Sequence, residues 1–243
     1  IVAVSAVNGG KKLANFSNFG VESVDVGAPG SSILSTVTDG VYGIAAVKAI
    51  NTGINGIGNA FVAAFGLEEF DGDQPSADDL LLRALDGIDP GDSILLVDDD
   101  GNDLIDYIDV YSFYYDALQN NNYTNVHFHT VASDTDNGPN ALKMSSYGAV
   151  IWFTGWAFGN YDPSNEDKWI TTLTEADQDN IMAYLDAGGT LLLFGEDVLR
   201  EIGDSELVKD YFGINIPIEN YGRNEMMEGI SGTPFAGAHY DIP

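Results

Sequence analysis

An acidic loop follows a short apolar segment near the middle of the chain. The segment 94–97 has the length and the unbroken apolar pattern of a strand that is buried on both faces, as in a parallel sheet. The polar residues after it are Asp98, Asp99, Asp100, Asn102 and Asp103. Calcium prefers several oxygen ligands from one flexible loop, so this loop predicts a calcium site, although its spacing is not that of an EF-hand. In the alternative interpretation Asp100 or Asn102 caps the next helix and the other carboxylates are solvated.

The segments around the loop predict the elements that position it. Strands are expected at 94–97, 124–131, 149–155 and 190–196, and helices at 104–118, 174–185 and 205–212. Alternating strands and helices form a parallel sheet with helices on both faces. Such sheets bind ligands at the carboxyl ends of their strands, where the acidic loop should lie. Glu196 and Asp197 should end the last strand at the same edge.

Composition limits the partners that this chain can have. The chain has 243 residues, of which 44% are hydrophobic, so it can form a substantial core. Its net charge of −29 repels phosphate backbones and anionic lipids, which argues against nucleic-acid binding. The apolar segments are too short for membrane insertion. Such a charge suits a saline or calcium-containing medium, so we expect a secreted or cell-surface location.

Four segments near the start of the chain resemble subtilisin-like serine proteases (subtilases). They are 1–7 (IVAVSAV), 16–20 (FSNFG), 24–30 (VDVGAPG) and 33–36 (ILST), in the order and spacing of the family. Segment 75–85 is similar to the helix that follows the serine helix in subtilases. The resemblance covers residues 1–88 and implies a partial subtilisin-like parallel sheet. The first residues already have the pattern of a buried strand, without Met or a leader, so we expect the chain to begin inside a longer gene product.

The subtilase resemblance implies a catalytically silent segment. The family carries its serine in a G-T-S motif at a helix N-terminus, and this chain contains no G-T-S. Aligning the family pattern on Gly56, Ala60 and Gly66 places Gly58 at the serine position; alternatively, the helix could begin at residues 45–50. The catalytic Asp and His of the family would lie before Ile1, so the Ser-His-Asp triad is incomplete here. We therefore expect no autonomous peptidase activity.

Residues 89–220 resemble the flavodoxin-like or glutamine-amidotransferase-like accessory modules of secreted proteases. The similar motifs are 95–100 (LLVDDD), 150–155 (VIWFTG) and 184–195 (YLDAGGTLLLFG). The predicted fold class is thus α/β, with the partial subtilisin-like sheet followed by a flavodoxin-like, three-layer, parallel-sheet module. The sequence contains no cysteine, which excludes amidotransferase activity, disulfides and thiolate metal sites. Residues 221–243 form a glycine-rich tail without an assigned place.

Two further groups of side chains could bind a ligand. An aromatic stretch consists of Trp152, Trp156, Phe158, Tyr161 and Trp169. It could form a sugar- or peptide-binding surface, or Trp152 could fill the core while the others anchor a loop. His127 and His129 should share one face of a strand, as zinc ligands could, but no third ligand is spaced to join them. A structural role is favoured for both histidines.

These observations favour a catalytically silent, subtilase-derived extracellular protein with a structural or self-assembly role. The first strand would lack the neighbours that subtilases supply from earlier sequence, so its edge should recruit another strand. The expected interface residues are Ile1, Val2, Ala3, Val4 and Val7. The partner would be another copy, in an oligomer or filament, or a cleaved N-terminal fragment. Two alternatives stay open: the C-terminal portion of a calcium-dependent subtilisin-like endopeptidase with its Asp and His upstream, and a sugar- or peptide-binding module.

Overall fold

The computed structural model describes twelve stretches of the chain, which contain all the elements discussed below. They are residues 4–7, 26–29, 49–52, 58–70, 73–86, 91, 93–101, 109–133, 135–162, 164–214, 226–228 and 237–241. The chain divides into two compact units, residues 1–35 and residues 36–243.

The first unit contains a two-stranded parallel sheet. Strand β1 (Val4–Val7) pairs with β2 (Val26–Pro29), with Val4 opposite Val26 and Val7 opposite Pro29. The strand predicted at the start of the chain is therefore confirmed for these four residues. Of the expected interface residues, Ile1, Val2 and Ala3 lie outside the described residues. Among the residues that are described, no strand pairs with the second edge of β1.

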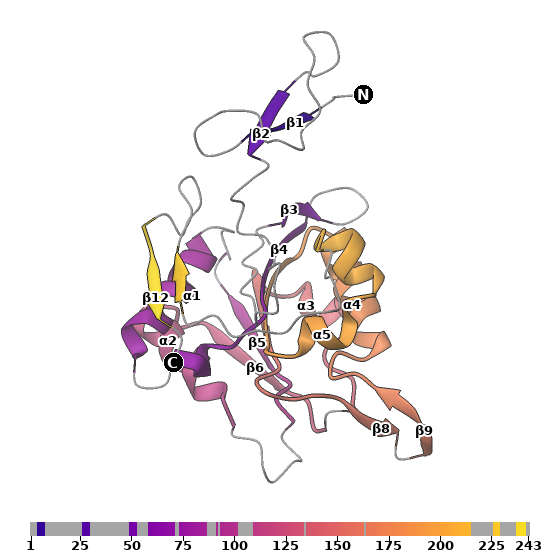
Figure 1. The fold of residues 1–243 in the computed structure, drawn as a ribbon. Coiled ribbons are helices and arrows are strands. Elements are labelled where there is room, and N and C mark those ends of the chain that lie inside the picture. The colour runs from indigo at the N-terminus through magenta and orange to yellow at the C-terminus, as the bar shows by residue number, and fades with distance from the viewer. Residues whose placement is uncertain are drawn as a thin grey trace. The chain divides into compact units, whose positions relative to one another are not determined.

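A six-stranded sheet forms the centre of the second unit (Figure 1). In spatial order its strands are β3 (Ala49–Thr52), β4 (Gly58–Ala63), β10 (Thr190–Phe194), β7 (Ala149–Phe153), β5 (Ile94–Asp98) and β6 (Val126–Thr130). The last five are parallel to one another, and β3 runs antiparallel to β4. Every residue of β5, β7 and β10 is buried, which explains their unbroken apolar sequences. The predicted α/β class with a parallel sheet is confirmed.

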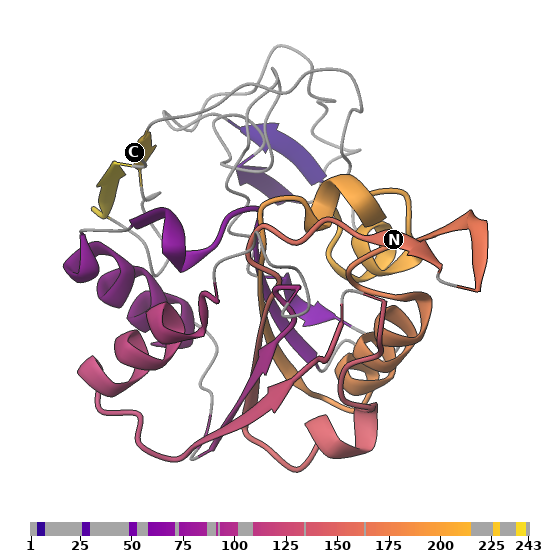
Figure 2. The ribbon, with the colours of Figure 1, turned by 90° about the horizontal axis from the view of Figure 1, so that it is seen from below.

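Helices cover both faces of this sheet (Figure 2). One face carries the 3-10 helix η1 (Leu67–Phe70), α1 (Gln74–Asp86) and α2 (Tyr111–Asn120). The other carries α3 (Ala141–Met144), α4 (Glu175–Asp186), α5 (Val198–Ile202) and the π-helix η2 (Leu207–Tyr211). Alternate strand residues serve the two cores: Leu96 and Phe153 pack toward α2, whereas Leu95 and Trp152 pack toward α4.

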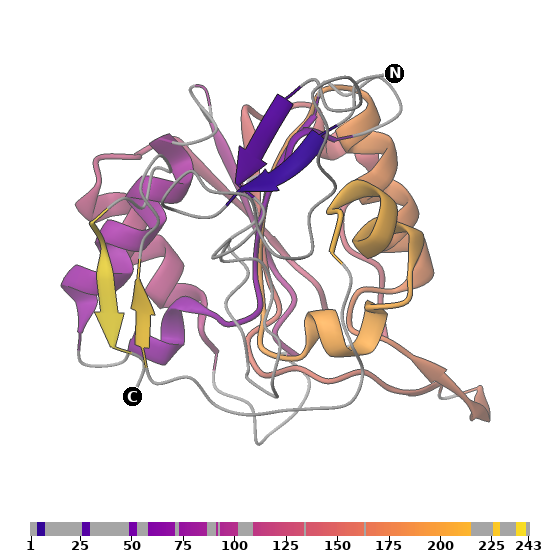
Figure 3. The ribbon, with the colours of Figure 1, turned by 45° about the horizontal axis from the view of Figure 1, so that its top comes forward.

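Two hairpins complete the described elements. Strands β8 (Asn160–Asp162) and β9 (Asn165–Ile170) form an antiparallel hairpin that projects from the α/β unit (Figure 3). Strands β11 (Met226–Glu228) and β12 (His239–Asp241) form the second, within the predicted glycine-rich tail. Among the helices that the structure describes, none combines the length and the apolar character needed to cross a bilayer.

The structure corrects the place expected for Gly58. The family alignment put this residue at a helix N-terminus, and it is instead the first residue of β4. A Cβ atom at Gly58 would lie 2.4 Å from the carbonyl oxygen of Leu185, so the bare backbone allows α4 to pack closely here. The sequence placed residues 1–88 in one segment and residues 89–220 in another. In the structure β4 pairs along its length with β10, and α1 packs on α2.

Helix α4, which precedes β10 in the chain, begins where the sequence predicts. Thr174 caps α4 by accepting a hydrogen bond from the Asp177 backbone, and the Asp177 side chain accepts one from the Thr174 backbone. This reciprocal capping box fixes the first turn. Helix α2 begins at Tyr111, so the second half of the helix predicted over 104–118 is confirmed; residues 102–108 lie outside the described residues.

Candidate functional site

The strand order changes direction between β5 and β7. The chain leaves β5 toward the outer strand β6, and it leaves β7 toward β10 on the opposite side. In open α/β sheets the crevice at such a switch point is the usual ligand site. Asp98 is the last residue of β5, Asp99 and Asp100 follow it, and Thr154 follows β7. We call these four residues, together with Glu68 from η1, the acidic edge.

The side chain of Asp99 lies on the face of the sheet that α4 covers, next to Trp152. Its backbone N–H donates to the Phe153 carbonyl at 3.0 Å, and its Oδ2 accepts the indole N–H of Trp152 at 2.9 Å. Burial raises the pKa of Asp99 well above its usual value, against the opposing effect of the Trp152 hydrogen bond. The Oδ1 atom of Asp99 has no hydrogen-bond partner within the described part of the chain.

Asp100 holds the start of the next helix. Its Oδ2 accepts the backbone N–H of Val110 at 2.8 Å, directly before α2 begins. Asp100 is not the N-cap that the sequence offered as an alternative to calcium binding, because the N-cap is Val110, but its side chain does bind the backbone of that residue. Burial raises the pKa of Asp100 to about 7, with the hydrogen bond from Val110 opposing the shift and the charges of Asp98 and Asp109 adding to it.

Glu68 is a buried carboxyl group that sequence reasoning missed. It reads as part of an acidic turn, and only its apolar neighbours Leu67 and Phe70 hint at burial. The side chain is 4% exposed, and its Oε2 accepts the phenol O–H of Tyr114 at 3.3 Å. Its pKa is raised to about 7, mainly by burial and in part by the charges of Glu69 and Asp100, while the hydrogen bonds from its own backbone and from Tyr114 oppose the shift. Its Oε1 has no partner among the residues that the structure describes.

The loop after β7 offers no accessible nucleophile. Thr154 is wholly buried, and its hydroxyl is the third buried oxygen without a partner in the described stretches. Gly195 packs so closely that an added Cβ would nearly overlap the Thr154 hydroxyl oxygen. Gly155 turns the chain with a φ of +52°, a value that favours glycine, and lies against Asp100 and Val110. The carboxyl groups of the acidic edge are therefore buried beside an inaccessible Thr154 hydroxyl.

The predicted calcium ligands are only partly described. Asp98, Asp99 and Asp100 lie together at the end of β5, where Thr130 also contacts Asp98 at 3.5 Å. Asn102 and Asp103 lie outside the described residues. Within the described ranges, no three His, Cys, Asp or Glu side chains are grouped as a metal would require. Calcium binding at this loop stays a prediction.

The histidines and two of the aromatic residues have local contacts. His127 contacts Asn125 at 3.2 Å, and His129 contacts Lys143, whose charge adds to burial in lowering the pKa of His129. Trp152 is wholly buried, as the core-filling alternative predicted. Trp156 is 36% exposed and donates its indole N–H to Glu69 at 3.0 Å.

Comparison of this chain with protein-family models, with curated proteins and with solved structures gave no match. The subtilase and flavodoxin-like resemblances therefore rest on the sequence motifs quoted above. The function has to be inferred from the geometry of the side chains.

Proposed function

We propose that this chain is a catalytically silent, subtilase-derived extracellular protein with a structural or self-assembly role. The observation that carries the proposal is the turn after β7, which has no exposed nucleophile. An amidotransferase-like enzyme would place a reactive cysteine on an exposed turn after a strand of this sheet. The turn after β7 holds the buried Thr154 and the side-chain-free Gly155 instead. A nucleophile that is absent or sealed from solvent cannot attack a substrate.

Strand order supports the flavodoxin-like part of the proposal. From the outer strand inward, the parallel strands lie in the order β6, β5, β7, β10 and β4. Counted from β5, the first four follow the 2-1-3-4 part of the flavodoxin-like order 2-1-3-4-5. Strand β4 occupies the place of the fifth strand, although it comes first in the chain. The segment before β5 therefore completes the sheet, so residues 58–214 are best treated as one module.

The two-stranded sheet supports the self-assembly role. β2 occupies one edge of β1, and among the described residues the second edge of β1 has no strand partner. An open strand edge pairs with another chain through its backbone hydrogen bonds. A second copy or a cleaved N-terminal fragment would fit this edge. A saline medium would favour such contact, because salt screens the repulsion between chains of net charge −29.

Two measurements test the proposal. The purified chain should neither cleave casein nor react with a fluorophosphonate probe, with active subtilisin as the positive control. Stoichiometric labelling of any serine would show that the chain is not silent. In light scattering at high salt, the full chain should form species larger than 26.0 kDa, and removal of residues 1–7 should abolish them. A full chain that stays monomeric at high concentration would refute the assembly role without affecting the first result.

A further inference from the structure

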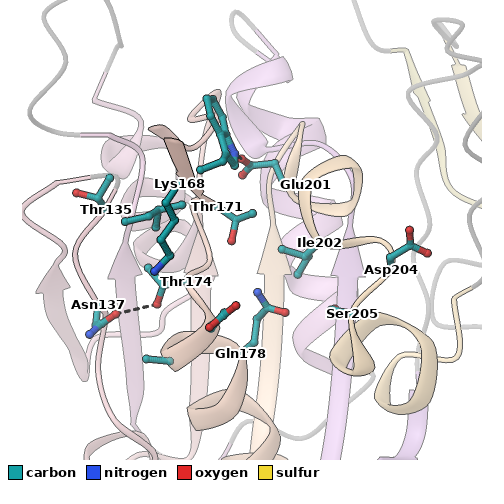
Figure 4. Close-up of a pocket in the computed structure, with 14 residues that line it drawn as sticks. Thr135, Asn137, Lys168, Thr171, Thr174, Gln178, Glu201, Ile202, Asp204 and Ser205 are labelled. Carbon is teal, nitrogen blue, oxygen red and sulfur yellow. Dashed lines mark hydrogen bonds between the residues drawn. The ribbon is translucent and has the colours of Figure 1, made fainter. Parts of the chain in front are cut away.

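A cavity of about 460 Å³ opens beside the β8–β9 hairpin, and none of the residues that line it belongs to the acidic edge. Its walls come from residues 135–137, from β9, from the start of α4 and from the end of α5 with the residues that follow it (Figure 4). The volume falls within the range of about 300–1,000 Å³ that is typical of small-molecule sites. Segments from three regions of the sequence, near residues 135–137, 168–178 and 201–205, thus line a space large enough for a small organic ligand.

An aromatic ring held in a fixed orientation lies in the wall of this cavity. Trp169 is 41% exposed and contacts the rings of Tyr161 and Phe158 at centroid distances of 5.1 and 5.4 Å. Its indole N–H points to Glu201 Oε1 at 3.4 Å, while Glu201 Oε2 accepts the backbone N–H of Thr172 at 3.0 Å. An exposed tryptophan that is braced in this way presents a flat apolar face without a large loss of side-chain entropy on binding.

Gly159 permits this arrangement. An added Cβ at this position would lie 2.2 Å from the Ile170 carbonyl oxygen, 2.5 Å from Glu201 Oε1 and 2.9 Å from Trp169 Nε1. Any side chain here would therefore displace the carboxylate that orients the ring. The backbone N–H of Gly159 in turn donates to the buried hydroxyl of Thr172 at 2.9 Å.

The remaining wall offers both donors and acceptors. The Lys168 side chain points into the cavity in the direction of Thr174 and Asn137 (Figure 4). Asn137 Oδ1 accepts the Thr174 hydroxyl at 2.8 Å, which leaves the Asn137 amide nitrogen to donate. Gln178 donates its amide nitrogen to the Leu173 carbonyl at 2.9 Å, which leaves its side-chain oxygen to accept. Together these groups can bind a ligand that both donates and accepts hydrogen bonds.

We propose that this cavity binds a neutral carbohydrate, with one sugar ring packed on Trp169. A sugar presents an apolar C–H face for the indole and hydroxyl groups that donate to carboxylate or amide oxygens and accept from Lys168 and Asn137. Three acidic residues line the cavity, namely Glu175, Glu201 and Asp204, so an anionic ligand is repelled. A cationic peptide would have to accommodate the like charge of Lys168. The proposal is independent of the assembly role.

Calorimetric titration with neutral tetrasaccharides of glucose, mannose, xylose and N-acetylglucosamine tests the proposal. At least one should bind the full chain with a Kd below about 1 mM, and the affinity should change less than about twofold between 0.1 and 0.5 M NaCl. Trp169→Ala should weaken binding about tenfold or more. Trp156→Ala is the matched control, since it removes a similarly exposed tryptophan outside the cavity, and it should leave affinity unchanged.

The variant Lys168→Met distinguishes a neutral sugar from a cationic peptide. It should not disturb folding, because Lys168 is exposed. A neutral sugar should bind this variant several-fold more weakly, since one hydrogen-bond donor is lost. A lysine-rich peptide would bind the variant more tightly than the wild type, with a steep dependence on salt, and that outcome would replace the sugar by a cationic peptide. The carbohydrate proposal is overturned if no tetrasaccharide binds, or if Trp169→Ala and Lys168→Met both leave binding unchanged.

Discussion

The phenol group of Tyr114 links two segments by donating to Glu68 Oε2 at 3.3 Å and accepting the backbone N–H of Leu67 at 3.1 Å. The Tyr114 ring stacks on Phe153 with a centroid distance of 4.3 Å and an angle of 8° between the ring planes. Glu68 is thereby held in an apolar layer between α2 and the sheet, with a single phenol as its side-chain hydrogen-bond donor among the described residues. Because its pKa is raised to about 7, the protonation state of this carboxyl group changes near neutral pH, and the stability of the fold should change with it.

Stability should fall as pH rises from about 4.5 to about 7. The pKa of Glu68 is raised from 4.5 to about 7, so the folded state retains a proton that the unfolded state has already released. A shift of this size corresponds to about 3 kcal/mol of stability that is present below pH 4.5 and lost by about pH 7. Asp100 acts in the same direction. In urea titrations at several pH values, Glu68→Gln should show a shallower decline than the wild type; an equal slope would contradict the prediction.

Replacing the isolated hydroxyl of Thr154 should not destabilise the protein. Thr154→Val removes a buried oxygen that has no partner in the described ranges, so we expect unchanged stability or a gain of up to about 2 kcal/mol. Thr172→Val is the matched control: this residue is equally buried, but its hydroxyl accepts the Gly159 N–H at 2.9 Å. The control should lose about 1–3 kcal/mol in denaturant unfolding. Similar losses in both variants would mean that Thr154 has a partner in the molecule.

The capping box of α4 should contribute measurably to stability. Thr174→Ala deletes the acceptor for the Asp177 backbone and the donor to Asn137, so the free energy of unfolding should decrease by about 1–2 kcal/mol. Ser146→Ala, which removes an exposed hydroxyl bonded to the Leu142 carbonyl, should change stability by less than about 0.5 kcal/mol. If the two variants unfold at the same denaturant concentration, the cap does not stabilise the folded state.

Calcium should raise the melting temperature through the loop that begins at Asp98. A ligand that binds only the folded state contributes about 2.7 kcal/mol at a hundredfold excess over its Kd. Asp98→Asn should reduce the calcium shift, whereas Asp179→Asn removes the same charge from the exposed side of α4 and should leave the shift unchanged. Magnesium and sodium serve as controls, because any cation screens a chain of net charge −29. An identical shift in both variants would place calcium elsewhere.

Local sequence was sufficient to predict several elements. The unbroken apolar segments at β5, β7 and β10 were identified as buried strands, since a strand covered on both faces has no polar side. The start of α4 followed from Thr174 and Asp177, whose hydrogen bonds span only three residues. The position of Asp98, Asp99 and Asp100 at the end of β5 was also predictable, because the end of a parallel strand is set by the strand itself.

Contacts between distant segments could not be derived in this way. The glycine- and alanine-rich sequence of β4 fits a helix as well as a strand, and only its pairing with β10 decides the matter. Glu68 and Tyr114 are 46 residues apart, so nothing local distinguishes Glu68 from the neighbouring Glu69. Trp169 was recognised as aromatic, but Glu201, which orients it, lies 32 residues away on α5. Spacing along the chain encodes periodicity and capping, whereas burial, pKa shifts and the walls of a cavity depend on which segments the folded chain brings together.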